Sequence, residues 1–381
     1  MDIEVHRQRL ADALSARGCW PVDSPWVREA MSALPRDLFA PDRLWVWDGE
    51  DYAPVDRATA PERWVRAVFA GPYDSAVTQV VDGLPASSLS CVSVVADMLD
   101  ALMAEPGHRI LELGTGSGWN AALLAARAGA GHVTSVEVDA WLADAARERL
   151  KAAGAGVDVR VCDGAGGWPG GAPYDRLIAT YAVDEVPWPW VEQTRPGGRL
   201  VLPWGRLGHI ALTVAGDGRS ASGWFQGLGM FMPSRGTGQG KPFHEVRGDR
   251  QPDTQDTPSL EPHLLRDGNL LFALRVLLPD VRISTETSGT GTRAWIHDGH
   301  SSWATLTPAT DSGTAATAYR GGPRRLDDEL TRAWQHWQAA GAPGLYDFGM
   351  TRTPTEQYIW TGDKDTGPRW QPLASLVPHS S

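Results

Sequence analysis

Three glycines at alternate positions, Gly114, Gly116 and Gly118, are the residues whose type and spacing first suggest chemistry. Glycine tolerates a positive φ, and a backbone without Cβ atoms can approach a ligand closely where a helix begins. A dinucleotide-binding turn would place its third glycine at position 119, where this chain has Trp119. With acidic Glu112 just ahead of it, the tighter turn favours S-adenosylmethionine, although an ordinary strand-to-helix turn would also explain the glycines.

Two carboxylates further along the chain strengthen the cofactor interpretation. Glu137 ends the apolar stretch 132–137, about where an acid binds ribose in α/β nucleotide sites. Asp163 follows the stretch 157–161, where a group contacting adenine is expected. Either acid alone is typical of a solvated loop or a helix cap, but both in register with the glycine turn indicate one cofactor site. The residues predicted to bind S-adenosylmethionine are Glu112, Gly114, Thr115, Gly116, Ser117, Gly118, Glu137, Asp163 and Gly164.

Alternating strands and helices must position these side chains. The apolar segments 109–113, 132–137 and 157–161 predict buried strands, and the segments 118–128 and about 139–153 between them predict helices. This alternation is typical of a parallel sheet covered by helices. The sequence therefore predicts an α/β, Rossmann-like fold around the glycine turn.

The chain ahead of the glycine turn carries weaker signals. Two helices are predicted within residues 2–34, and the stretch 47–87 is predicted to be mostly irregular. Long irregular stretches in compact domains tend to be binding segments or disordered, and the aromatic residues in this one favour a flap that faces the substrate. A serine cluster then runs into an amphipathic helix over 87–103, where Ser90 or Ser93 could serve as the helix N-cap.

Composition and charge limit the classes of protein. A chain of 381 residues, 42% hydrophobic and 21% charged, is typical of a soluble globular protein with two domains. No apolar run approaches the length of a membrane span, and the net charge of -11 argues against a nucleic-acid partner. Three scattered cysteines, Cys19, Cys91 and Cys162, suit a reducing compartment, and no secretory signal is visible, so the predicted location is the cytoplasm.

The last third of the chain has the pattern of a separate α+β module. An apolar segment over 270–278 precedes two predicted strands around an Asp-Gly turn, and 323–340 predicts an amphipathic helix. His297 and His300 flank that turn; without further Cys or His partners at ligand spacing they are interpreted as turn residues, and no metal site is predicted. The predicted parts are 1–85, N-terminal helices and substrate-facing segment; 86–232, cofactor-binding core; 233–262, linker; and 263–381, C-terminal α+β domain.

A set of short segments in consistent order points to a family. They are Trp26 to Asp42, Ser88-Leu89-Ser90, Leu111 to Gly118, Ser135-Val136-Glu137, Asp163-Gly164, Ala172-Pro173-Tyr174-Asp175 and Pro196 to Val201. Together they resemble the protein-L-isoaspartate O-methyltransferase family. The resemblance implies a Rossmann-like class I S-adenosylmethionine-dependent methyltransferase fold, here with an additional C-terminal α+β domain. It also aligns Ser88 to Ser90 with a Thr-Ile-Ser element whose last serine is assigned to the active site, so Ser90 inherits a catalytic role, helped by Ser88.

Two departures from that family shape the predicted function. This chain has Cys91-Val92-Ser93 at the place where the repair enzymes have a segment like Ala-Pro-His. It also continues beyond their length through the segment 233–262, which is rich in proline, glycine and polar residues. With Val77 to Gly83 and Gly321 to Leu326, this layout resembles a divergent branch associated with ribosomally made, modified peptides. Graspetides, cyclised by ATP-grasp enzymes, are the nearest match, with lanthipeptides and lasso peptides as neighbours.

The resemblance implies methylation of an aspartate side-chain carboxylate, after which the ester closes to an aspartimide (succinimide) and yields isoaspartate. The implied partner is a modified precursor peptide that contains an aspartate, and the C-terminal domain is assigned by elimination to its recognition. The alternative is a protein-L-isoaspartate (D-aspartate) O-methyltransferase that repairs damaged proteins. A non-catalytic cofactor- or peptide-binding protein and a methyltransferase with a small-molecule acceptor are further interpretations.

Overall fold

The computed structural model describes residues 2–205, 207–236, 240–309 and 316–375. The chain divides into two compact units, one of Met1–Arg235 with Thr351–Gln357 and one of Gly236–Met350 with Tyr358–Ser381. No helix among the described residues is long and apolar enough to cross a membrane.

The predicted linker 233–262 has secondary structure in its described part. It contains the short helix α8 (Phe243–Arg247) and the strand β12 (Thr254–Asp256). Residues 237–239 of this predicted linker lie outside the described residues, as do 310–315 and 376–381 of the predicted C-terminal domain.

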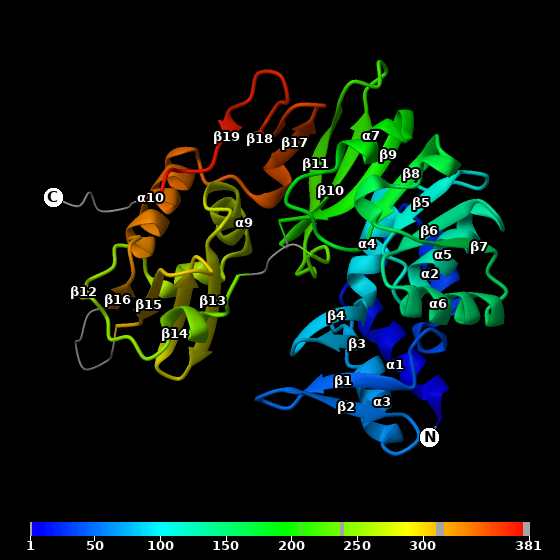
Figure 1. Ribbon diagram of the computed structural model, residues 1–381, viewed down its shortest axis with the longest axis horizontal. Helices are drawn as coiled ribbons and strands as arrows, with labels where there is room; N and C mark the ends of the chain where they lie inside the picture. The colour runs from blue at the N-terminus through cyan, green and yellow to red at the C-terminus, as the bar shows by residue number, and fades with distance from the viewer. Residues whose placement is uncertain (1, 206, 237–239, 310–315, 376–381) are drawn as a thin grey trace. The chain divides into compact units, whose positions relative to one another are not determined.

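The first unit is built on a sheet whose strand order includes β11-β10-β9-β8-β5-β6-β7 (Figure 1). Strands β9, β8, β5, β6 and β7 pair in parallel, and β9, β10 and β11 pair antiparallel. The chain runs from β5 outward to β7 and then returns to place β8 on the other side of β5. The strand order therefore reverses between β5 and β8. The strands are β5 (Ile110–Leu113), β6 (Val133–Glu137), β7 (Val157–Val161), β8 (Tyr174–Ala179), β9 (Thr194–Trp204), β10 (Gly208–Val214) and β11 (Ala221–Leu228).

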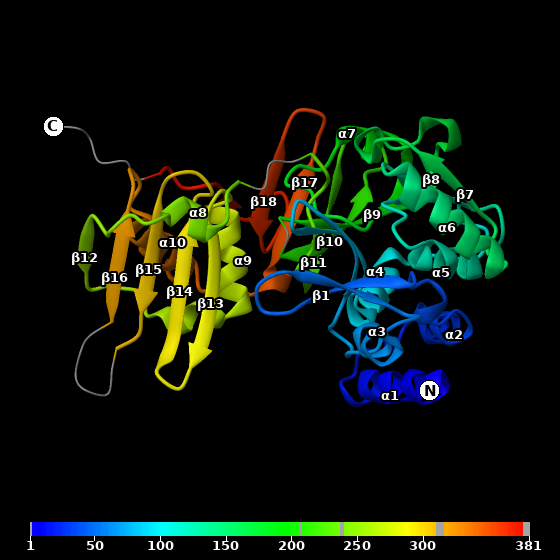
Figure 2. The ribbon, with the colours of Figure 1, turned by 60° about the horizontal axis from the view of Figure 1, so that its bottom comes forward.

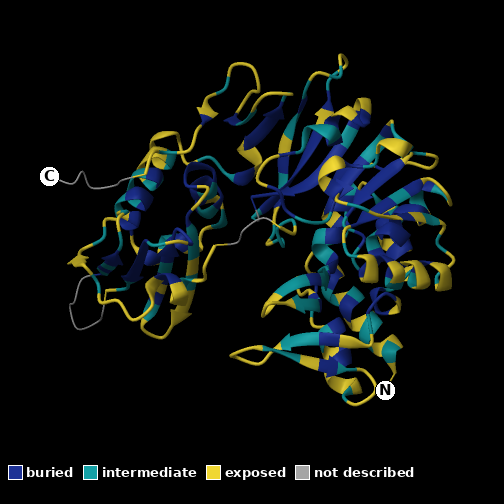
Figure 3. Cartoon of the chain, viewed as in Figure 1, coloured by how far each residue is buried: buried dark blue, intermediate teal, exposed yellow. Residues whose placement is uncertain are grey.

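Helices pack on this sheet and on one another. Helix α4 packs against β8 to β11, α5 against β5 to β7, and α6 against β6 and β7. Asp139 caps α6, since its carboxylate accepts the N–H groups of Trp141 and Leu142 at 2.9 and 3.2 Å. Figure 3 shows the central strands of this sheet largely buried, and Ile110, at the start of β5, is 0% exposed. The helices are α1 (Ile3–Ala16), α2 (Pro25–Ala33), α3 (Pro61–Val68), α4 (Val92–Leu102), α5 (Trp119–Ala128), α6 (Ala140–Ala152) and α7 (Trp188–Glu192).

The predicted strands over 109–113, 132–137 and 157–161 are confirmed, and so are both helices between them and the two N-terminal helices. Each of these elements carries its own periodic apolar pattern and its own start or stop signal. That is why their bounds differ from the prediction by only a few residues.

The prediction that 47–87 is mostly irregular is wrong. This stretch forms α3 and three strands of a second sheet of order β2-β1-β3-β4. Pro54 lies within β2 and Pro85 within β4, at the two edges of the sheet, where a missing N–H is tolerated. The prolines masked the strand pattern. The strands are β1 (Arg43–Trp47), β2 (Tyr52–Asp56), β3 (Ala76–Val81) and β4 (Leu84–Leu89).

A segment from late in the chain completes the first unit. The Nε group of Arg352 donates to the backbone oxygen of Val186 at 2.7 Å, and the backbone N–H of Val186 donates to the side-chain oxygen of Gln357 at 2.8 Å. Val186 is 0% exposed. Both of its backbone polar groups therefore find partners in residues 351–357.

The second unit holds an antiparallel sheet of order β12-β16-β15-β14-β13 (Figure 2). Helix α10 packs on β14, β15 and β16 and against α9, and strand residues such as Ala294, Ile296 and Leu306 are buried. This is an α+β arrangement. Its elements are α9 (Gly268–Leu277), β13 (Arg282–Ser288), β14 (Gly291–His297), β15 (Trp303–Thr307), β16 (Thr317–Gly321) and α10 (Leu326–Ala339); β17 (Phe348–Arg352) and β18 (Gln357–Thr361) cross the unit boundaries, and β18 pairs with β19 (Arg369–Trp370).

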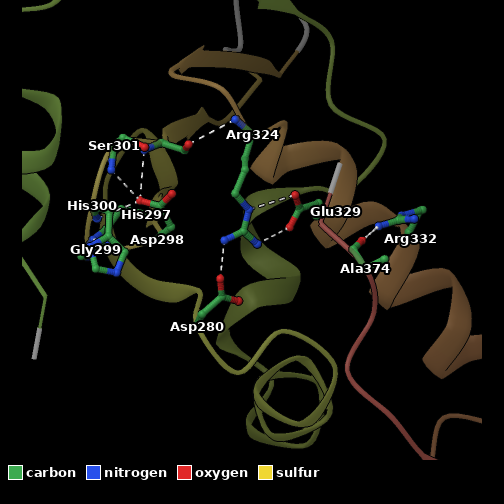
Figure 4. A network of polar contacts seen from close by, with 11 residues as sticks. Asp280, His297, Asp298, Gly299, His300, Ser301, Arg324, Glu329, Arg332 and Ala374 are labelled. Atoms are coloured by element: carbon green, nitrogen blue, oxygen red, sulfur yellow. Dashed lines mark hydrogen bonds and ion pairs between the residues drawn. The ribbon is translucent and has the colours of Figure 1, made fainter. Parts of the chain in front are cut away.

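The turn between β14 and β15 is organised by a carboxylate (Figure 4). Asp298 accepts the backbone N–H groups of His300 and Ser301, each at 2.9 Å. His300 therefore lies in the predicted turn, whereas His297 is the last residue of β14. The described residues hold no group of three or more His, Cys, Asp and Glu side chains placed to bind a metal ion.

An ion-pair network also lies in the second unit (Figure 4). The guanidinium of Arg324 pairs with the carboxylate of Glu329 at 2.6 Å and with that of Asp280. Glu329 is 0% exposed, and removing one partner of a buried pair leaves an uncompensated charge. The network thus ties the start of α10 to the loop between α9 and β13.

Candidate functional site

A pocket of about 200 Å³ lies in the first unit, at the carboxyl ends of its parallel strands. Ligands in open α/β sheets bind at this edge, where the strand order reverses, which here is between β5 and β8. The pocket is lined by residues that follow β5, β6, β7 and β8, by the end of β4, and by the segment after β11. Its lining includes Ser88, Ser90, Gly114, Thr115, Gly116, Ser117, Trp119, Glu137, Asp163, Gly164, Thr180, Tyr181 and Arg235.

The glycine turn forms one wall of the pocket. Gly114, Gly116 and Gly118 have backbone φ angles of +94°, +53° and +90°, which residues with a side chain rarely adopt. A Cβ on Gly114 would collide with the hydroxyl of Thr180, which donates to the backbone oxygen of Gly114 at 2.7 Å, and would lie 3.0 Å from the ring of Tyr181. The turn therefore requires glycine at position 114.

The two predicted carboxylates line the same pocket. Glu137 is 6% exposed, and its two oxygens accept the N–H of Gly116 at 2.9 Å and that of Asp139 at 3.1 Å. Asp163 is exposed and accepts the N–H of Ala165 at 2.9 Å, so it also caps the short helix η2 (Gly164–Gly166). An acid at the end of β6 and another after β7 thus line one pocket with the glycine turn.

Glu112, another predicted cofactor ligand, does not line the pocket. It is 0% exposed and accepts hydrogen bonds from the amide of Asn120 at 2.8 Å and from the hydroxyl of Ser135, which contacts Thr115 Oγ1 at 2.6 Å. Burial, and less strongly the nearby charge of Glu137, raises the pKa of Glu112 to about 7. Glu112 is thus linked through Ser135 to Thr115 in the glycine turn. Gly118, the N-cap of α5, likewise lies outside the pocket lining.

Replacing Glu112 by glutamine is expected to stabilise the protein by up to about 3 kcal/mol near pH 8 and by less than about 1 kcal/mol near pH 5. The folded-state pKa of about 7 lies above the ordinary 4.5, so the native state binds the proton more tightly. Wild-type stability therefore falls as pH rises from about 4.5 to about 7. Urea unfolding of both proteins at the two pH values measures the difference; an equal difference at both would disprove this account.

Ser88 and Ser90 reach the pocket from the end of β4. Both line it, and neither hydroxyl has a hydrogen-bond partner among the described residues. Neither Ser90 nor Ser93 caps α4, because Cys91 occupies the N-cap position and Ser93 Oγ donates to the backbone oxygen of Pro72 at 2.9 Å. The Ser90 hydroxyl is therefore free to donate to a ligand.

Residues that the sequence analysis missed also shape the pocket. Arg235 pairs with Asp139 at 2.9 Å and hydrogen-bonds to the side chain of Gln79, which itself donates to Asp139 at 3.1 Å. These three residues are distant in sequence, and no local pattern joins them. Tyr181 follows β8; burial and the charges of Asp163 and Glu137 raise its pKa, so it stays protonated. Its place at the strand-order reversal was the one available signal.

Comparison with known proteins agrees with this geometry. The model of the family "Protein-L-isoaspartate(D-aspartate) O-methyltransferase (PCMT)" matches residues 52–216. The chain is 35% identical over 242 residues to the protein-L-isoaspartate O-methyltransferase of Methylorubrum extorquens, covering 63% of this chain and 92% of that protein. It is 37% identical to protein-L-isoaspartate O-methyltransferase 1 of Rhodopseudomonas palustris, covering 56% of this chain and 77% of the relative.

A solved structure of a protein-L-isoaspartate O-methyltransferase matches 94% of this chain and 100% of its own, with 19% identity and a TM-score of 0.49. The sequence relationship to the Methylorubrum protein covers nearly all of that relative. The chain therefore belongs to the protein-L-isoaspartate (D-aspartate) O-methyltransferase family and is an S-adenosylmethionine-dependent O-methyltransferase.

Proposed function

We propose that the enzyme methylates the free carboxylate of an isoaspartyl residue in a peptide or protein, as the names of its relatives state for them. The observation that carries this proposal is a pair of hydroxyls, Ser88 and Ser90, that have no hydrogen-bond partner among the described residues and lie in the pocket with the glycine turn and Glu137. Hydroxyl groups that can donate are suited to orienting an anionic acceptor. Sequence analysis favoured an aspartate of a precursor peptide, and the comparisons support the isoaspartate alternative better.

The residues around the pocket divide into a cofactor wall and an acceptor wall. Gly114 and Gly116 would cradle the bound cofactor, Glu137 would accept hydrogen bonds from its ribose, and Asp163 from its adenine amino group. When bound, S-adenosylmethionine supplies an activated methyl group on a sulfonium. Ser90, helped by Ser88, would donate hydrogen bonds that aim the acceptor carboxylate at that group.

The protein needs no general base for this reaction. A carboxyl group with an ordinary pKa of about 4 is already ionised at neutral pH. The remaining tasks are to remove water from the carboxylate and to align it, and alignment alone can supply much of a rate enhancement. Ser90 and Ser88 perform this positioning in the proposed mechanism.

The methyl ester then reacts without further help. The backbone nitrogen of the following residue attacks the ester carbonyl, its proton and the methoxy group leave as methanol, and a succinimide forms. Hydrolysis of the succinimide gives aspartate or isoaspartate. The same ester chemistry therefore serves repair of a damaged protein or installation of a modified residue.

A second candidate function is methylation of an aspartate in a modified, ribosomally made precursor peptide. Cys91-Val92-Ser93 supports it, because this segment begins α4 directly beside Ser90 and departs from the repair enzymes' pattern. The second unit, which contains the sheet β12 to β16, also supports it, because it offers a place for peptide recognition. The proposal includes the predicted division of the chain into residues 1–85, 86–232, 233–262 and 263–381. All three cysteines are free thiols, which suits a cytoplasmic location for either function.

Mass spectrometry after incubation with S-adenosylmethionine distinguishes the two functions. One acceptor is a generic isoaspartyl peptide, and the other is a cyclised precursor peptide with an ordinary aspartate. Methylation of the isoaspartyl peptide alone is expected. Methylation of the aspartyl peptide alone, followed by net loss of water, would instead establish the maturation enzyme, and methylation of neither would contradict both proposals.

Hydrogen exchange tests the role proposed for the second unit. If the second unit recognises the acceptor peptide identified by mass spectrometry, amide exchange in β13 to β16 should be slower with that peptide present than without it. Protection confined to residues around Ser90 would show that the first unit binds the acceptor alone. A cofactor-only sample is the control for effects of S-adenosylmethionine.

A further inference from the structure

Arg36 is a cation buried behind the acceptor wall of the pocket. It begins the short helix η1 (Arg36–Leu38) and is 3% exposed. One terminal nitrogen, Nη2, donates to the backbone oxygens of both Leu89 and Ser90 at 3.0 Å, and Nη1 donates to the backbone oxygen of Asp74 at 3.4 Å. The guanidinium thus holds the junction between β4 and α4, where Ser90 lies.

No carboxylate hydrogen-bonds to this guanidinium within the described part of the chain. The adjacent Asp37 is engaged by Arg7, whose Nε and Nη2 lie 2.9 and 2.7 Å from its oxygens. Burial lowers the pKa of Arg36 to about 10, while the nearby Cys91, Asp74 and Asp37 act less strongly in the opposite direction, so the group remains charged at neutral pH. A buried charge to which no carboxylate hydrogen-bonds is costly to keep. Neutral donors could satisfy the same carbonyl oxygens, so hydrogen bonding alone does not account for the charge.

Arg36 also lies near Trp119, which lines the pocket. Its guanidinium lies 5.9 Å from the ring centre of Trp119, the residue that follows the glycine turn. The indole N–H of Trp119 donates to the backbone oxygen of Leu34 at 2.8 Å. One segment, 34–36, therefore holds both the serine that would face the acceptor and the helix that starts at the glycine turn.

We propose that Arg36 is a positioning residue, which fixes Ser90 relative to the glycine turn and favours an anionic acceptor through its buried positive charge. This inference rests on the role of Ser90 in the proposed function. The ligand favoured by this positive charge is an anion such as a carboxylate. A charge in a water-poor interior acts on it more strongly than a charge at the surface would. The cofactor wall gains nothing from this charge, since the sulfonium is itself positive.

Two substitutions separate the hydrogen bonds from the charge. Arg36→Lys keeps the charge but loses the fork that spans two carbonyl oxygens; kcat should fall about tenfold while KM for the acceptor peptide changes less than about twofold. Arg36→Met removes both, and KM should also rise about tenfold. The dissociation constant of S-adenosylmethionine should stay within about twofold in both variants. Arg127→Met is the matched control, because Arg127 likewise packs on a tryptophan, Trp26, and donates to a backbone oxygen; its kcat and KM should not change.

A double-mutant cycle with Ser90→Ala tests whether Arg36 acts through Ser90. If it does, Arg36→Lys should lower kcat less than about twofold in the Ser90→Ala background, because coupled residues are not additive. Additive losses, or equal losses of cofactor affinity, would overturn the inference by showing a general structural role. A Ser90→Ala variant with wild-type turnover would be a different result, since it would refute the proposed role of Ser90 and the Arg36 inference with it.

Discussion

Replacing Gly114 by alanine should weaken binding of S-adenosylmethionine by at least about 100-fold, a loss of about 3 kcal/mol. The φ of +94° at this position is strained for any residue with a Cβ. The new methyl group would also collide with the Thr180 hydroxyl and press on the Tyr181 ring, and both residues line the pocket. Relief of the collision requires Thr180 to rotate away and lose its hydrogen bond to Gly114. Isothermal titration calorimetry with S-adenosylmethionine measures the loss.

Gly107→Ala is the matched control for backbone strain. Gly107 has a φ of +81°, and a Cβ there would have no atom within 4 Å. Alanine should cost about 1 kcal/mol of stability at this position, while the affinity for S-adenosylmethionine stays within about twofold. If Gly114→Ala bound the cofactor as well as Gly107→Ala does, the turn would not be the cofactor cradle.

Ser90→Ala should lower kcat about 30-fold, because the lost hydrogen bond to a charged acceptor corresponds to about 2 kcal/mol. The affinity for S-adenosylmethionine should stay within about twofold, since the cofactor wall is built from other residues. Initial rates of methyl transfer to the acceptor identified by mass spectrometry, together with a titration of the cofactor, separate the two effects. A loss of cofactor affinity with unchanged kcat would reassign Ser90 to cofactor binding.

Ser93→Ala is the matched control for this substitution. Ser93 lies three residues further on, and its hydroxyl is occupied by the backbone oxygen of Pro72. Its removal should cost about 1 kcal/mol of stability but leave the rate of methyl transfer unchanged. The contrast between the two serines therefore tests position within the pocket rather than the loss of a hydroxyl as such.

The methyltransferase core could be predicted from the sequence because the patterns that indicate it are each contained in a short segment. Strands β5, β6 and β7 are short apolar runs, the glycines mark the turn, and Glu137 and Asp163 come directly at strand ends. Parallel strands bring their carboxyl ends to one edge of the sheet, so sequence order alone places these residues together. The site predicted from those signals coincides with the pocket except at Glu112 and Gly118.

The parts that could not be predicted depend on contacts between distant residues. Glu112 points into the protein because its carboxylate accepts hydrogen bonds from Asn120 and Ser135. The residue type alone does not indicate whether a side chain at the end of a strand faces the pocket or the protein interior. Arg36 and Arg235 reach the pocket region from segments in which no residue was predicted to belong to the site. The sheet over 47–87 was missed because its edge strands carry proline, which in a sequence favours a loop.

The return of residues 351–357 to the first unit bears on how this enzyme is made. A nascent chain that ends before Arg352 leaves both backbone groups of the buried Val186 without the partners they have in the finished protein. The first unit therefore cannot complete its packing until the ribosome has also synthesised 236–350, and closing so long a loop slows that last step. A premature stop or frameshift in the second unit should thus reduce the yield of folded enzyme even when every residue of the pocket has been translated.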